Sequence, residues 1–187
     1  KKFGRSNVSG IITEAGSDQG ECDSGWAFHL AQVMTDRIRI QQAKDNESTR
    51  FPDEWELSPM QLLAESGQCN GGSFEAGVEL LQKKGISSKS CHPYNPDMFK
   101  RPISSLYDAA CSGDGEQNPK PYKMRNGTNK ELSTESLRQE RIDSAASRIM
   151  EEVTSNGPIV CRISIFKDFF QNKNKRDGGI YACIPFE

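Results

Sequence analysis

Residues 19–28 read QGECDSGWAF, and this stretch decides the fold. Ser24 stands where a helix N-cap is expected, and apolar residues recur frequently after it. The sequence therefore predicts a helix over residues 25–42. Its apolar residues cover more than one stripe, so we expect the helix to be buried on most sides. These residues are Trp26, Ala27, Leu30, Ala31, Val33, Met34, Ile38 and Ile40.

Two further helices are predicted after the first. Ser58 followed by Pro59 is a typical helix start, because proline suits the first helical position. That helix ends before the turn at residues 69–72, which read CNGG. A third helix is expected over about residues 73–84, where apolar residues recur at spacings of four and three. Gly85 closes it.

The second half of the chain has a different pattern. Residues 112–141 are nearly all polar and predict either a loop that crosses the molecule or a partly disordered insert. A short helix over residues 144–155 leads to the turn at 156–158, which reads NGP. Residues 159–166 (IVCRISIF) and 179–184 predict strands. Helices early and strands late predict an α+β protein with two lobes.

Composition excludes several classes of protein. The 187 residues carry a formal net charge of −2, which argues against a nucleic-acid partner. No run approaches the roughly 18 consecutive apolar residues that a membrane span needs. The chain has two histidines and no C-x-x-C pair, so we expect neither a metal site nor a cofactor.

Cysteines and glycosylation sequons favour the secretory pathway. Six cysteines at wide spacings are typical of disulfides formed in an oxidising compartment. Three sequons are present, at Asn7, Asn46 and Asn126. We therefore expect an extracellular, lysosomal or vacuolar protein.

Residues 19–28 resemble the active-site stretch of papain-like cysteine proteases, whose pattern is Q-G-x-C-G-S-C-W-A-F. Further blocks follow in the order of that family, at residues 57–58, 69–72, 93–94, 156–158 and 179–181. Residues 36–40 (DRIRI) and 156–161 (NGPIVC) look most like the cathepsin X, B and C branch. The resemblance implies one papain-like domain over residues 1–187 that lacks its C-terminal part. Residues 20–111 would form the helical left lobe, and residues 112–187 the crossing loop and first strands of a β-barrel-like right lobe.

The resemblance places the nucleophilic cysteine of the family at Gly25. Glycine has no side chain, so no acyl-enzyme can form at this position, and we expect no catalytic residue. Gln19 matches the glutamine of the oxyanion hole. Gly71 and Gly72 match the segment that pairs with an extended substrate, and Trp26 is a further substrate-binding candidate, although a core position suits it better. Ser24 is the helix cap and therefore a poor substitute nucleophile.

The catalytic histidine and asparagine of the family lie later in the right lobe than Glu187. His29 is expected to be a core or interlobe residue, and His92 a loop residue. We therefore expect a second chain, or another protein subunit, to complete the right lobe. An extended peptide in the cleft is a further expected partner.

Two disulfides are implied by the resemblance, Cys22–Cys69 and Cys91–Cys111. Cys161 and Cys183 remain open: they pair with each other, or one of them reaches the missing C-terminal part.

The main functional hypothesis is a catalytically inactive homologue, a pseudoprotease that serves as a binding or structural subunit. One alternative is the heavy chain of an active cathepsin-like endopeptidase or exopeptidase, with Gly25 an engineered or misassigned position. Another is an architectural domain whose cleft is filled by a neighbour.

Overall fold

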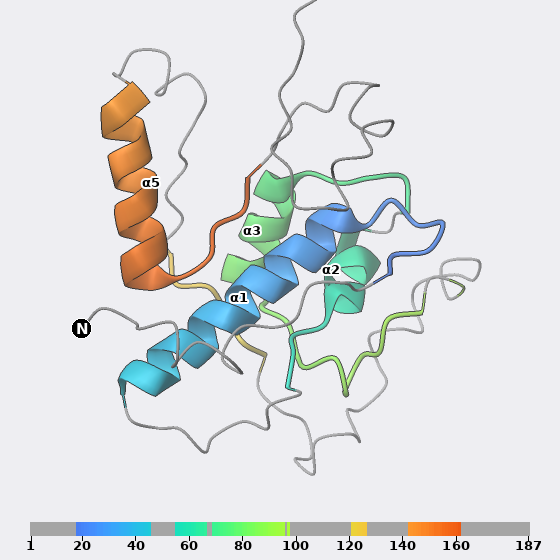
Figure 1. Cartoon of the computed structure of the whole chain (residues 1–187). Coiled ribbons are helices and arrows are strands. Elements are labelled where there is room, and N and C mark those ends of the chain that lie inside the picture. The colour runs from blue at the N-terminus through green and yellow to red at the C-terminus, as the bar shows by residue number, and fades with distance from the viewer. Residues whose placement is uncertain are drawn as a thin grey trace, which may run out of the picture.

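The computed structural model describes residues 18–45, 55–66, 69–95, 97, 121–126 and 142–161. Its elements are α1 (Gly25–Lys44), α2 (Pro59–Ser66), α3 (Phe74–Lys83) and α5 (Ile142–Asn156). Helix α1 runs through the centre, and α2 and α3 pack against one side of it (Figure 1). The four helices in the described ranges were all predicted from the sequence, although α5 begins two residues earlier than expected.

The core lies between α1, α2 and α3. Three leucines of α2 and α3, Leu62, Leu63 and Leu81, are completely buried there. Helix α1 contributes residues from several of its faces, as the sequence predicted. Its buried residues are Trp26, Ala27, Leu30, Ala31, Met34, Thr35, Asp36 and Ile40.

The starts of α2 and α3 follow the local sequence. Pro59 is the first residue of α2, and the Ser58 hydroxyl accepts a hydrogen bond from the Gln61 amide at 3.3 Å. Ser73 caps α3 in the same way, with its Oγ 3.3 Å from the Ala76 amide nitrogen. These hydroxyls satisfy amides that have no partner within the helix. Gly85 ends α3 with a φ of 79°, a conformation that favours glycine.

Extended segments join the helices into one unit. The Leu57 amide donates to the Thr35 hydroxyl of α1 at 3.0 Å. Ile86 and Tyr122 form an antiparallel bridge through two backbone hydrogen bonds, of 2.8 and 3.0 Å. We call residues 18–45, 55–66 and 69–95 the helical unit.

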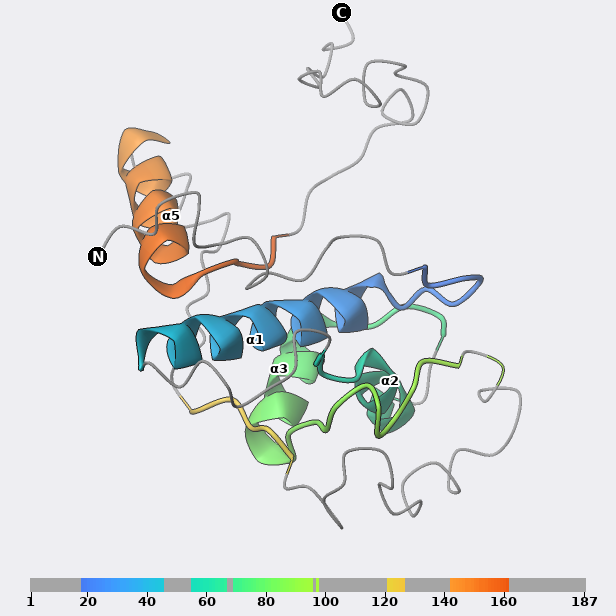
Figure 2. The ribbon, with the colours of Figure 1, turned by 60° about the horizontal axis from the view of Figure 1, so that its bottom comes forward.

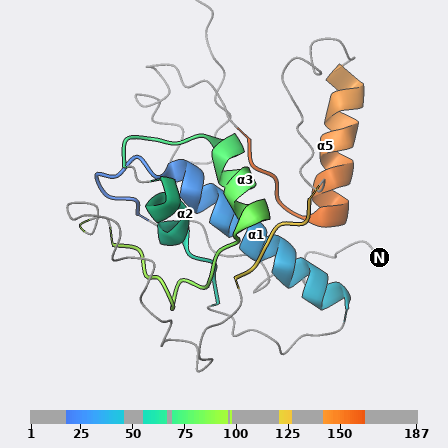
Figure 3. The same cartoon turned by 180° about the vertical axis from the view of Figure 1, so that it is seen from behind.

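Helix α5 lies on the other side of α1 from α2 and α3 (Figure 2). In the view from behind, α3 lies in front of α1 (Figure 3). The Arg37 side chain of α1 donates to the Pro158 carbonyl at 2.9 Å and to the Glu152 carboxylate at 3.1 Å. Gly157 turns the chain after α5 with a φ of 98° and packs on Ile40. The predicted turn at 156–158 thus attaches α5 to α1.

Most of the predicted right lobe lies outside the described residues. Residues 159–161 have no regular structure, and residues 162–166 and 179–184 are not among those described. In the described ranges, bridges occur only as isolated pairs. The predicted strands and barrel-like lobe therefore stay predictions. Within the same ranges, no helix is long and apolar enough to cross a membrane.

Candidate functional site

Gly25 is the first residue of α1 and is half-buried. Among the described residues, and apart from the adjoining chain and the helix backbone, a Cβ placed on it would have one atom within 4 Å, the Gln19 Oε1, at 3.2 Å. That atom is the end of a flexible side chain, which can move by a few tenths of an ångström. Neither packing nor a positive φ therefore requires glycine at this position. The position has room for a side chain that the sequence does not supply.

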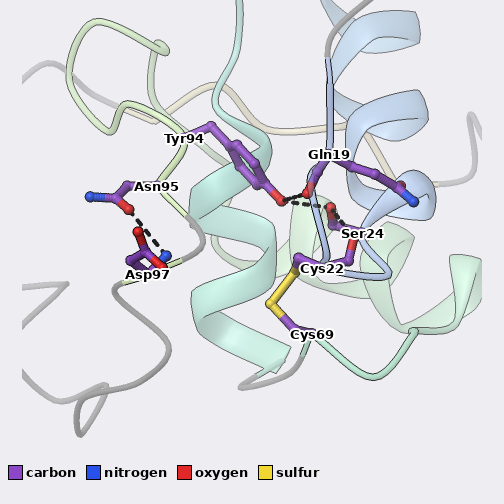
Figure 4. The surroundings of a disulfide bond; sticks show 7 residues. All are labelled: Gln19, Cys22, Ser24, Cys69, Tyr94, Asn95 and Asp97. Atoms are coloured by element: carbon purple, nitrogen blue, oxygen red, sulfur yellow. Dashed lines mark hydrogen bonds between the residues drawn. A yellow bond between two sulfur atoms is a disulfide. The ribbon is translucent and has the colours of Figure 1, made fainter.

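Gln19, the predicted oxyanion-hole residue, lies beside Gly25. Its side chain is the one that a Cβ at Gly25 would meet. The main-chain carbonyl oxygen of Gln19 accepts a hydrogen bond of 2.8 Å from the Tyr94 hydroxyl (Figure 4). The structure thus brings together the two positions that sequence analysis assigned to nucleophile and oxyanion stabilisation.

Tyr94 fixes this turn to α1, a role that sequence analysis did not assign. Its hydroxyl is 2.9 Å from the Ser24 Oγ, in addition to its bond to Gln19 (Figure 4). Its ring packs edge to face on Phe28, with ring centroids 4.6 Å apart. The Pro-Tyr pair at residues 93–94 was the available signal, since it was one of the blocks that carried the resemblance.

Ser24 corrects one prediction. It occupies the N-cap position of α1, but its side chain makes no capping hydrogen bond. The hydroxyl instead contacts Tyr94 and donates to the Cys22 carbonyl at 3.2 Å. Ser24 is completely buried, and its hydroxyl is engaged in these contacts. Both features make it unsuitable as a substitute nucleophile.

A disulfide joins Cys22 to Cys69, as the resemblance implied, with a Cα–Cα distance of 4.5 Å (Figure 4). Next to it, the Asp23 amide donates to the Cys69 carbonyl at 2.9 Å, and Asp23 pairs with Asn70 in a parallel bridge. These links place Gly71, 46 residues after Gly25 in the sequence, alongside the start of α1.

Gly72 lies on Trp26. A Cβ at Gly72 would be 2.3 Å from the indole ring, so only glycine lets the chain pass this close. Trp26 is 7% exposed and belongs to the core, as expected. Gly72 itself is exposed, and its backbone makes no hydrogen bond among the described residues. Ser73, which follows, has an extended backbone.

The histidines do not complete a catalytic pair in the described residues. His29 is exposed on α1, so it is not a core residue, and the interlobe position that was the other expectation stays a prediction. The reason is that α1 is buried on several faces but not on this one. His92 lies in a loop, as predicted, and burial lowers its pKa from 6.5. No histidine atom is within 4 Å of a Cβ placed at Gly25.

The remaining predicted residues have mixed outcomes. Cys91 is disulfide-bonded, and its expected partner Cys111 lies outside the described residues. Cys161 is an exposed free thiol, so a bond between it and Cys183, one of the two alternatives left open, is not formed in this structure. Asn126 is exposed in a turn, whereas Asn7 and Asn46 are not described. No group of acidic, histidine and cysteine residues in the described ranges could hold a metal ion.

The comparisons agree with this geometry. The model of the papain family cysteine proteases matches residues 5–183, and the chain belongs to that family. Membership implies the papain-like α+β fold, of which the structure describes helices α1, α2, α3 and α5.

Several proteins are similar to the chain over most of its length. The human tubulointerstitial nephritis antigen-like protein is 27% identical over 176 residues, which are 90% of this chain and 35% of that protein. The human tubulointerstitial nephritis antigen is 28% identical over 89% of this chain and 34% of its own length. Cathepsin B-like cysteine proteinase 4 of Caenorhabditis elegans is 25% identical over 88% of this chain and 51% of its own. The chain thus spans about a third of the length of the two human relatives.

Proposed function

We propose that the chain is a catalytically inactive papain-family protein, a pseudoprotease, which acts as a binding or structural subunit. The observation that carries the proposal is Gly25. It stands at the start of α1 beside Gln19, where a thiolate would be stabilised by the helix N-terminus. Without a nucleophilic side chain there, the site cannot form a covalent intermediate.

The contacts that hold the residues around Gly25 in place form without a nucleophilic side chain at position 25. The Tyr94 hydroxyl holds the turn at Gln19, and the Cys22–Cys69 disulfide holds Gly71 and Gly72 next to α1. Gly72 offers an exposed backbone without a hydrogen-bond partner among the described residues. An extended peptide pairs with such a backbone through its main chain, and this pairing needs no cysteine. We propose an extended peptide as the ligand of this site.

The alternative is the heavy chain of an active cysteine peptidase in which Gly25 replaces a cysteine. Two observations support this alternative. Packing and backbone conformation do not require glycine at position 25, and one relative is named a cathepsin B-like cysteine proteinase. Other relatives are named as antigens.

The proposed compartment is extracellular, lysosomal or vacuolar. Support comes from the Cys22–Cys69 disulfide, because such bonds persist in oxidising environments. A partner chain that completes the right lobe stays a prediction.

A labelling experiment distinguishes the two functions. Because Cys161 is an exposed free thiol, the background is the Cys161→Ser variant. We expect this variant to hydrolyse no fluorogenic peptide and to form no adduct in residues 19–28 with a thiol-reactive epoxide. The matched variant Gly25→Cys, in the same background, should form an adduct at position 25, located by peptide mass spectrometry. Peptide hydrolysis by repurified native protein would overturn the proposal.

A further inference from the structure

Asp23 places a negative charge beside Gly71 and Gly72, which we call the glycine pair. A Cβ on Gly71 would be 3.2 Å from the Asp23 Oδ2, so the carboxylate lies against Gly71. Asp23 is exposed. Its side chain makes no hydrogen bond and no ion pair in the part of the chain that the structure describes. A carboxylate without a partner among the described residues is therefore available at this point.

The backbone at Asp23 is held in place from both sides. Its amide donates to the Cys69 carbonyl at 2.9 Å, and the preceding residue, Cys22, is covalently bonded to Cys69. Ser24, the next residue, is buried and bonded to Tyr94. The carboxylate therefore extends from a backbone position that has little freedom, which lowers the entropy cost of forming an ion pair with a ligand.

The charged residues on the same turn as Asp23 have one sign. Asp18 and Glu21, on the same turn, are also exposed, and the sequence has no lysine or arginine between residues 18 and 36. A negative local potential of this kind attracts cationic groups.

A second observation, independent of charge, concerns Trp26 below the same glycine pair. Its Nε1 is the buried side-chain polar atom that has no hydrogen-bond partner among the described residues, and it lies against Gly72. Buried donors in native proteins are nearly always paired. The glycine pair thus has an unpaired carboxylate on one side and an unpaired donor on the other.

We infer that Asp23 selects the ligand of this site: an extended peptide with a lysine or arginine side chain, whose cationic group pairs with the Asp23 carboxylate. This inference rests on the proposed peptide-binding function and adds the chemical class of the peptide. The peptide backbone would run along Gly71 and Gly72, so a side chain that points toward α1 reaches the carboxylate.

The test uses two fluorescent hexapeptides that differ at one position, lysine in one and norleucine in the other. Norleucine keeps most of the lysine stem without the charge. We expect the lysine peptide to bind about fivefold more tightly at low ionic strength, the upper range for an exposed ion pair. This preference should shrink as salt is added. Fluorescence anisotropy against the full chain measures both affinities.

Two variants assign the preference to a residue. Asp23→Asn should remove it by weakening binding of the lysine peptide, whereas the matched control Glu21→Gln should retain most of it. Both side chains are exposed, so both variants are expected to fold. Equal binding of the two peptides to native protein would overturn the inference and leave the proposed function standing. A preference that survives in Asp23→Asn would also overturn it. Binding of neither peptide would overturn the inference together with the peptide-binding role.

Discussion

The helical unit and α5 are stabilised in different ways. In the helical unit, Leu62, Leu63 and Leu81 are completely buried between three helices. On α5, Met150 and Val153 are 64% and 44% exposed. Helix α5 is joined to α1 by the Arg37 hydrogen bonds and the turn at Gly157. Apolar burial thus concentrates in the helical unit, which also carries the candidate site at the start of α1.

The largest predicted effect comes from removing the disulfide of the helical unit. Cys22 and Cys69 are separated by 47 residues, and a loop of this size corresponds to about 4 kcal/mol in the chain-entropy description. The double variant Cys22→Ser, Cys69→Ser should lower the free energy of unfolding by that amount. Denaturant titration followed by circular dichroism measures it.

The matched control for this prediction is Cys161→Ser, because Cys161 is exposed and unpaired. It should change the free energy of unfolding by less than about 0.5 kcal/mol. Equal losses in the two variants would contradict the view that the disulfide stabilises the helical unit in particular.

A pair of core and surface truncations tests the contrast in burial. Leu81→Ala removes a completely buried side chain and should cost about 3 kcal/mol. Met150→Ala on α5 should cost less than about 0.5 kcal/mol, since its side chain is mostly exposed. Urea midpoints of the two variants measure the difference. A large loss from Met150→Ala would mean that this face of α5 is covered in solution.

Sequence reasoning predicted best what depends on neighbouring residues. Pro59, Ser73 and Gly85 mark helix boundaries because their effects are limited to one turn of chain, and the structure confirms all three. The same rule predicted Ser24 as the cap of α1, but its side chain makes no capping hydrogen bond. The Ser24 hydroxyl instead contacts the hydroxyl of Tyr94, which lies 70 residues away in the sequence. No local rule detects such a contact.

The candidate site was predicted only in part for the same reason. The position of Gln19 beside Gly25 follows from a motif that is continuous in the sequence. The contact of the Asp23 carboxylate with Gly71 needs the Cys22–Cys69 bond and a bridge between distant residues. A core position for His29 was wrong because a helix with apolar residues on several faces does not indicate which face stays exposed.

The attachment of α5 is tested at Gly157. Alanine at this position would have to adopt a φ of 98°, a conformation that favours glycine. Its methyl group would lie 2.4 Å from the Ile40 Cδ1. Gly157→Ala should therefore cost about 2 kcal/mol, mostly from the left-handed backbone and local repacking. Hydrogen exchange should become faster in α5 and stay unchanged in α2 and α3. The control Ser155→Ala alters a neighbouring exposed residue and should leave α5 protected. Faster exchange throughout the chain would contradict separate stabilisation of the two regions.

The smallest predicted effect is a pH dependence that belongs to the helical unit. Burial lowers the pKa of His92 from 6.5, and the His92 carbonyl accepts the Ser58 hydroxyl at 2.6 Å, next to the start of α2. The unfolded chain therefore takes up a proton at higher pH than the folded chain. Stability is full above about pH 6.5 and falls as the pH drops below it, until the folded histidine is also protonated. His92→Gln should flatten this part of the stability curve, measured by denaturant titration between pH 5 and 8. Because His92 is only half-buried, the change is small, and a slope that persists unchanged in His92→Gln would assign it to other groups.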